Sequence, residues 1–235
     1  MRLLLLSNST LPGEPFLQWP RPHLAAFLPA PARIAFVPYA AVTVTFDAYA
    51  DAVAGPFAEL GHTLESVHRS DDPAALVDGA DAVAVGGGNT FQLLRLLYKH
   101  DLLRAIRRRV RDGMPYIGWS AGSNVACPTI MTTNDMPITE PPSFRALDLV
   151  PFQINPHYTD ARLEGHGGET RDQRLAEFLV ANPQRRVIGL REGSLLHVTD
   201  ERMRLVGRPA RLFRSGAEPV ELADGTDLRV DLAGH

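Results

Sequence analysis

One serine in the sequence lies in a setting that suits a nucleophile. Residues 118–122 read Gly-Trp-Ser-Ala-Gly, which matches the pattern G-x-S-x-G around Ser120. An apolar run at 115–119 precedes Ser120, and a helix-competent stretch at 121–126 follows it. In so sharp a strand-to-helix turn, glycines avoid a collision of side chains, and the N–H of Ala121 points from a helix N-terminus toward a developing oxyanion. The pattern therefore predicts acyl transfer with Ser120 as the nucleophile.

A serine hydroxyl needs a base before it can attack a carbonyl group. Of the eight histidines, His157 comes directly after the apolar run that begins at Phe152, so it would lie just past the end of a strand. In a doubly wound sheet the site lies beyond the carboxyl ends of the strands. We therefore predict His157 as the base. His166, in a glycine-rich segment, is the reserve candidate.

The imidazole of the base needs a carboxylate that orients it, and the sequence offers two. Glu192 follows the apolar run 187–190, again at a strand end, whereas Asp135 lies in the irregular segment after Ser120. Asp135 would give the chain order Ser–acid–His, and Glu192 would give Ser–His–Glu, which differs from that of α/β-hydrolases. Strand-end placement favours Glu192, but both residues stay candidates from sequence alone.

A second tight turn follows the apolar run 81–85. It reads Gly-Gly-Gly-Asn-Thr at 86–90, where the third glycine comes too early for a dinucleotide fingerprint and no lysine follows for a P-loop. Its glycines allow the backbone to approach a ligand closely, so the N–H of Gly88 is the candidate second oxyanion donor. We also assign Asn89, in the same turn, to substrate binding.

The elements that must position these residues alternate between strand and helix, which predicts an α/β fold with a doubly wound, mostly parallel sheet. Pro56 should break or kink the first predicted helix, and the proline-rich segment 128–151 should be a long loop. Four short apolar pieces near the C-terminus predict an antiparallel β extension within one domain spanning 1–235. The predicted strands are 3–6, 33–37, 63–67, 81–85, 115–119, 152–155 and 187–190, the helices are 46–60, 91–98, 102–111 and 171–180, and the C-terminal pieces are 195–198, 203–206, 211–213 and 220–222.

Composition excludes several other classes of protein. The chain has 235 residues and a formal net charge of −3, which does not favour a nucleic-acid partner. No apolar run approaches the roughly 20 residues of a membrane span. A lone cysteine, Cys127, forms no internal disulfide and fits a reducing cytoplasm. We expect a cytoplasmic protein that binds neither membrane nor nucleic acid.

Five motifs in order along nearly the whole chain give it a resemblance to the peptidase E family of α-aspartyl dipeptidases. The resemblance implies a metal-independent serine peptidase without a cofactor, which removes N-terminal aspartate from small peptides and forms a homodimer. It also implies a fold related to class I glutamine amidotransferases and flavodoxin-like sheets. The motifs are GGGNTF at 86–91, GWSAGS at 118–123, NDMP at 134–137, NPH at 155–157 and GETR at 168–171.

Carried over residue by residue, the resemblance makes Ser120 the nucleophile and His157 the base. Glu192 and Asp135 both occupy positions proposed for the acid, and Gly88 and Ala121 match the oxyanion donors. Arg171 matches the position expected to bind the aspartate side chain.

The residues alone leave other interpretations open. Arg171 could instead pair with Glu169 or Asp172 on a surface helix. A cyanophycinase-like peptidase acting on a β-aspartyl polymer, a general carboxylesterase and a binding module without activity are the alternatives. The Ser–His–Glu order argues against the esterase.

Overall fold

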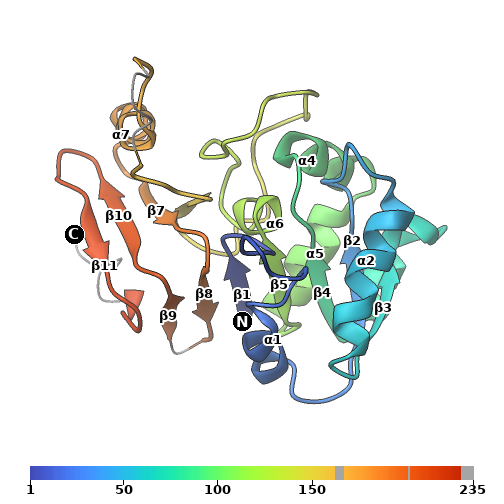
Figure 1. Cartoon of the computed structure of the whole chain (residues 1–235). Coiled ribbons are helices and arrows are strands. Elements are labelled where there is room, and N and C mark those ends of the chain that lie inside the picture. The colour runs from blue at the N-terminus through green and yellow to red at the C-terminus, as the bar shows by residue number, and fades with distance from the viewer. Residues whose placement is uncertain (162–166, 201, 229–235) are drawn as a thin grey trace.

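The computed structural model describes residues 1–161, 167–200 and 202–228. Its main sheet has seven strands in the order β3-β2-β4-β5-β1-β8-β9 (Figure 1). The first five of these pair in parallel, and β8 and β9 continue the sheet antiparallel from the edge of β1. The strands are β1 (Leu3–Leu6), β2 (Arg33–Val37), β3 (Thr63–Ser66), β4 (Ala82–Val85), β5 (Tyr116–Trp119), β8 (Ser194–Val198) and β9 (Met203–Gly207).

Helices cover both faces of this sheet, as the alternation of side chains along β1 requires. Leu4 and Leu6 point into one buried cluster with α1 and α2, whereas Leu3 and Leu5 point into the other cluster with α3, α4 and α5. The sheet is therefore doubly wound, as predicted. The helices are α1 (Arg21–Phe27), α2 (Phe46–Ala58), α3 (Pro73–Gly79), α4 (Thr90–Lys99), α5 (Leu102–Arg111), α6 (Ala121–Asn124) and α7 (Arg171–Ala181), with a 3₁₀ turn η1 (Val67–Arg69).

A second sheet of four strands lies beside the main one, in the order β11-β10-β7-β6 (Figure 1). It contains β6 (Gln153–Pro156), β7 (Arg186–Leu190), β10 (Ala210–Arg214) and β11 (Val220–Leu222). The strands β6 and β7 pair in parallel, and β10 and β11 add to them antiparallel. One face joins the main core through Ile154 and Ile188, and α7 covers the other face with Leu175 and Leu179.

The fold class predicted from the sequence is confirmed, and several details differ. The apolar runs at 152–155 and 187–190 do form strands, but in this separate sheet. Helices α1 and α3 were not predicted. Pro56 lies inside α2 without breaking it, because the helix ends two residues later at Ala58 and the buried Val53 and Phe57 hold its last turn in the core.

Candidate active site

The turn around Ser120 is as tight as its glycines suggest. Ser120 has a positive φ of 53° with ψ at −114°, and its N–H donates to the carbonyl oxygen of Leu6 at 3.1 Å. A Cβ at Gly122 would lie 2.1 Å from the Val85 carbonyl oxygen, and one at Gly118 would lie 2.6 Å from the Gly122 carbonyl oxygen. These contacts are with backbone, so only glycine fits, and the bend holds Ser120 in a conformation that a non-glycine residue rarely adopts.

The helix after Ser120 is shorter than the sequence suggested. Helix α6 covers only Ala121–Asn124, a single turn, where a stretch to residue 126 was expected. A one-turn helix has little dipole of its own. The contribution of α6 to an oxyanion site therefore comes from the individual N–H of Ala121 and not from a helix dipole.

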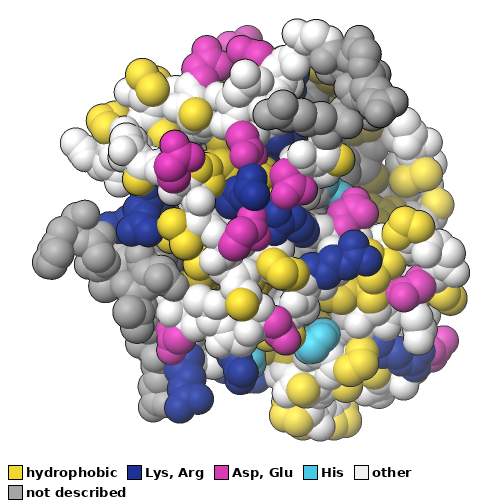
Figure 2. All heavy atoms as spheres, turned by 60° about the vertical axis from the view of Figure 1, so that its left-hand side comes forward, with side chains coloured by type: hydrophobic (Ala, Val, Ile, Leu, Met, Phe, Trp, Pro, Cys, Tyr) yellow, Lys and Arg dark blue, Asp and Glu magenta, His cyan; other side chains and the backbone are white. Residues whose placement is uncertain are grey.

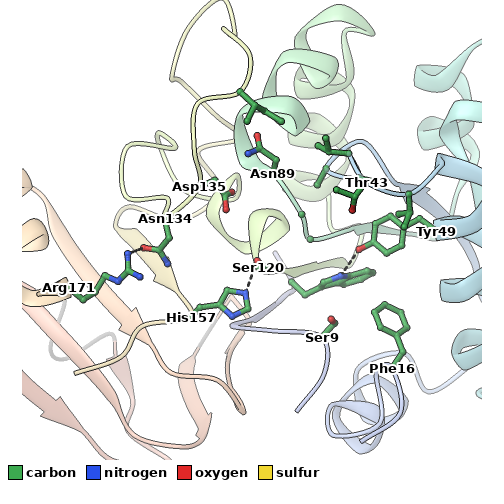
Figure 3. Close-up of a pocket in the computed structure, with 18 residues that line it drawn as sticks. Ser9, Phe16, Thr43, Tyr49, Asn89, Ser120, Asn134, Asp135, His157 and Arg171 are labelled. Atoms are coloured by element: carbon green, nitrogen blue, oxygen red, sulfur yellow. Dashed lines mark hydrogen bonds between the residues drawn. The ribbon is translucent and has the colours of Figure 1, made fainter. Parts of the chain in front are cut away.

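An imidazole lies between the serine and a carboxylate. The Nε2 atom of His157 lies 2.9 Å from the Ser120 Oγ (Figure 3). Its Nδ1 lies 2.7 Å from Oε1 of Glu192. An ionised carboxylate can only accept, so Nδ1 carries the proton and donates it to Glu192. In the neutral ring Nε2 is then free to accept the Ser120 hydroxyl proton, which is the state that a general base requires.

The two sheets meet at this point because their strands end there. Ser120 follows β5, His157 follows β6, and Glu192 comes two residues after β7. Ser7, just after β1, ties the sheets together: its Oγ accepts from the His157 N–H at 2.9 Å and donates to the Leu190 carbonyl oxygen at 2.7 Å. Its neighbour Asn8 accepts from the Gly193 N–H at 2.9 Å.

Sequence reasoning missed Ser7 and Asn8. Their position directly after the first strand, at the carboxyl edge of the sheet, was the available signal.

Asp135 has other partners than the imidazole. Its Oδ2 accepts from the Thr90 N–H at 2.7 Å, the Thr90 hydroxyl at 2.6 Å and the Thr133 hydroxyl at 3.1 Å. Both ring nitrogens of His157 are already bonded, so in this arrangement Asp135 does not orient the base directly. It fixes the start of α4, where Asn89 is the N-cap, accepting from the Gln92 N–H at 3.0 Å and donating to the Met136 carbonyl oxygen at 2.9 Å.

The turn at Gly88 places near the same site a backbone N–H that has no hydrogen-bond acceptor among the described residues. Gly88 has a φ of 134°, which side chains rarely allow, and a Cβ there would lie 2.2 Å from the Ala40 carbonyl oxygen. Both the backbone conformation and the lack of space therefore require glycine. Neither its N–H nor that of Ala121 donates to an acceptor in the described part of the chain. Both groups are available to hold an oxyanion.

Arg171 reaches the site from the first residue of α7. Its Nη1 donates to Oδ1 of Asn134. The surface pairs that could have neutralised it do not form, because Glu169 pairs with Arg174 and Asp172 pairs with Arg211. No described carboxylate lies within ion-pair distance of Arg171, and burial together with the nearby Arg174 lowers the pKa of its guanidinium.

The residues Ser120, His157, Asp135 and Arg171 line one cleft of about 790 Å³. Figure 3 shows Ser120 and His157 in its middle, Arg171 and Asn134 on one side, and Phe16, Tyr49 and Thr43 on the other. Volumes of this size hold small ligands.

The remaining candidates for chemistry add little. Cys127 is buried, and burial raises its pKa to about 12, so it is not a competing nucleophile. His166 lies outside the described residues. Within the described ranges, no His, Cys, Asp and Glu side chains cluster in a way that could hold a metal ion. Likewise, none of the helices there is long and apolar enough to cross a membrane.

Comparison with known proteins gives consistent matches. The sequence model of Peptidase family S51 matches residues 3–206. A protein named Peptidase E from Nostoc sp. is 52% identical over 94% of this chain and 92% of its own length, and one from Streptomyces coelicolor is 54% identical over 97% and 93%.

Two solved structures share the fold. The crystal structure of a putative peptidase E from Listeria monocytogenes has a TM-score of 0.65 at 20% identity, covering 88% of this chain and 98% of its own. A peptidase from an acI-B1 Actinobacterium has a TM-score of 0.72 at 17% identity, covering 96% and 95%. Family match, sequence relatives and fold agree, and the chain therefore belongs to peptidase family S51, as a serine peptidase.

Proposed function

We propose that this serine peptidase removes N-terminal aspartate from dipeptides and other small peptides. The observation that carries the proposal is the guanidinium of Arg171, which lies in the cleft beside Ser120 and His157 without a carboxylate partner among the described residues. A fixed guanidinium binds a carboxylate through two parallel hydrogen bonds and leaves a charge unpaired when a neutral asparagine takes its place. The relatives named Peptidase E support the same activity.

The proposed mechanism is acyl transfer through Ser120. His157 takes the hydroxyl proton through Nε2, and Ser120 attacks the carbonyl carbon of the aspartyl residue. Glu192 holds the protonated imidazole, and the N–H groups of Gly88 and Ala121 stabilise the oxyanion. His157 then gives the proton to the leaving amine, and a water molecule releases aspartate from the acyl-enzyme. No step requires a metal or a cofactor. Asn89 and Asn134 shape the wall that receives the substrate.

The test is turnover of three chromogenic anilides, those of aspartate, asparagine and glutamate. We expect cleavage of the aspartyl compound and a decrease in kcat/KM of roughly 100-fold or more in Arg171→Met, because the substrate carboxylate then loses its charged partner. The control is Arg104→Met on the exposed face of α5, away from the cleft, which should retain full turnover.

Each alternative predicts a different result. Cleavage of a simple ester with the aspartyl anilide untouched would favour an esterase. Cleavage of β-aspartyl-arginine polymer alone would favour a cyanophycinase-like enzyme. No turnover of any compound would favour a binding module.

We also propose that the protein works in the cytoplasm as a homodimer. The cytoplasmic location is supported by the single, buried Cys127, which needs no oxidising compartment. The dimer rests on the resemblance to the family, and light scattering coupled to size-exclusion chromatography would test it.

A further inference from the structure

Asp135 uses only one of its two carboxylate oxygens inside the protein. Oδ2 accepts all three hydrogen bonds, from the Thr90 N–H, the Thr90 hydroxyl and the Thr133 hydroxyl. Oδ1 has no partner among the described residues, although Asp135 lines the cleft. Figure 3 shows this side chain projecting into the cleft close to Ser120. The three donors on Oδ2 fix the carboxylate group in place. Its other oxygen, Oδ1, is therefore oriented to accept a hydrogen bond from a ligand in the cleft.

The part of the cleft wall that the structure describes carries one negative and one positive side chain. Asp135 is the single carboxylate and Arg171 the single guanidinium among the described residues that line it. They are held close together because Asn134, the residue before Asp135, accepts from Arg171 Nη1. Asn134 is itself fixed, since its Nδ2 donates to the Pro156 carbonyl oxygen at 2.7 Å and its Oδ1 also accepts from Asn155 at 2.6 Å.

This pair of charges matches one end of the proposed substrate. An N-terminal aspartyl residue carries an ammonium group and a β-carboxylate on adjacent carbon atoms. We propose that Oδ1 of Asp135 accepts a hydrogen bond from the α-ammonium group of the substrate while Arg171 binds its β-carboxylate. The inference rests on the proposed function and extends it: the enzyme selects a free N-terminus as well as an acidic side chain.

The amine and the carboxylate are then recognised separately, so a substrate that lacks only the amine tests Asp135 alone. Succinyl p-nitroanilide is aspartyl p-nitroanilide without its α-amino group. The wild-type enzyme should prefer the aspartyl compound by about 10- to 100-fold in kcat/KM, the scale of one charge-assisted hydrogen bond.

The variant Asp135→Asn keeps an oxygen for Thr90 and removes the charge. In this variant the preference for the aspartyl compound should fall to near 1, chiefly because turnover of that compound decreases. Asp135→Ser is a second neutral variant in case the first does not fold, which circular dichroism would reveal. Thr90→Val is the matched control: it weakens the support of the carboxylate but keeps its charge, so the preference should persist even if both rates fall.

The outcomes separate this inference from the proposed function. A wild-type enzyme that cleaves both compounds equally well, or a neutral variant that keeps the full preference, would overturn the role of Asp135 while aspartyl peptidase activity stands. A wild-type enzyme that cleaves neither compound would instead remove the proposed function.

Discussion

The hydrogen bond from His157 to Glu192 determines which ring nitrogen of the proposed base carries the proton. Because Glu192 accepts from Nδ1 at 2.7 Å, the tautomer with a free Nε2 is the stable one, and that nitrogen lies 2.9 Å from the Ser120 Oγ. The same carboxylate would stabilise the imidazolium ion that forms when the serine loses its proton. In the proposed mechanism, Glu192 therefore acts on the reaction through the ring and not on the substrate.

Replacement of Glu192 with glutamine should therefore lower kcat and leave KM nearly unchanged. The amide can present an N–H to Nδ1 and so favour the wrong tautomer, and a loss of about 10²- to 10⁴-fold in kcat is expected. Steady-state kinetics with the aspartyl anilide would measure it. Glu218→Gln, at an exposed turn, is the matched control and should retain wild-type kinetics. Unchanged kcat in Glu192→Gln would reopen the case for Asp135.

Sequence patterns could predict that Ser120 and His157 lie at the same edge of the fold, because each directly follows a segment predicted to form a strand. They could not choose between Glu192 and Asp135, since that choice depends on side chains far away in the sequence. Thr90 engages Asp135 from 45 residues away. Arg171 likewise has no ion-pair partner among the described residues, because the acidic residues near it in the sequence pair with other arginines. Glu169 pairs with Arg174, and Asp172 pairs with the distant Arg211.

At the scale of elements, the site exists where two sheets bring their strand ends together. The sequence pattern did not reveal two sheets. The strands β6 and β7 pair in parallel, and their pattern is therefore the same as if they continued the main parallel sheet. What separates them is β8, which occupies the free edge of β1 in antiparallel register. A C-terminal hairpin with short apolar runs gives no local sign of which edge it will cover.

The second sheet also connects the site to an ion-pair network on its outer side. Figure 2, which brings this side of the molecule forward, shows basic and acidic side chains interleaved near its middle. Three members of the network, Tyr158, Asp172 and Arg191, directly adjoin site residues in the chain. The network joins Arg191 and Arg211 to Asp160, Asp172 and Glu221, and both arginines also lie over the Tyr158 ring.

Ser7 offers a direct test of the junction between the sheets. Ser7→Ala leaves the His157 N–H and the Leu190 carbonyl oxygen without their shared partner. The free energy of unfolding should fall by about 1–3 kcal/mol, and kcat should fall with it because His157 loses its backbone anchor. Urea unfolding and turnover of the aspartyl anilide would measure the two effects. The control is Ser215→Ala in an exposed turn, and equal behaviour of both variants would contradict the anchoring role.

For the molecule as a whole, alternating strand and helix patterns with buried strands were enough to predict the doubly wound class. The same strand and helix pattern could not predict which histidines are buried and which are exposed. Burial lowers the pKa of His62, His100 and His197. His62 is the extreme case, because it is 4% exposed and neither ring nitrogen has a partner in the described structure.

These fully or partly buried rings should make the protein less stable as the pH falls below neutrality. A histidine with a lowered pKa in the folded state stays neutral there, while the same side chain in the unfolded chain takes up a proton near pH 6.5. The unfolded state then binds more protons, so each such group lowers the free energy of unfolding by up to about 1.4 kcal/mol per pH unit, from that value down to the lowered pKa of the folded state. Above about pH 7 the effect vanishes.

His62→Phe removes the most deeply buried of the three histidines, and the new ring would pack near Phe57, whose ring centroid lies 6.3 Å from that of His62. Urea unfolding between pH 5.5 and 7.5 should show a shallower loss of stability in this variant than in the wild-type protein. Phe152→Leu is the control, because it removes buried core volume at a position with no contact to these histidines and should lower stability equally at every pH. Curves for His62→Phe and wild type that run parallel across this range would show that protonation of His62 does not oppose folding.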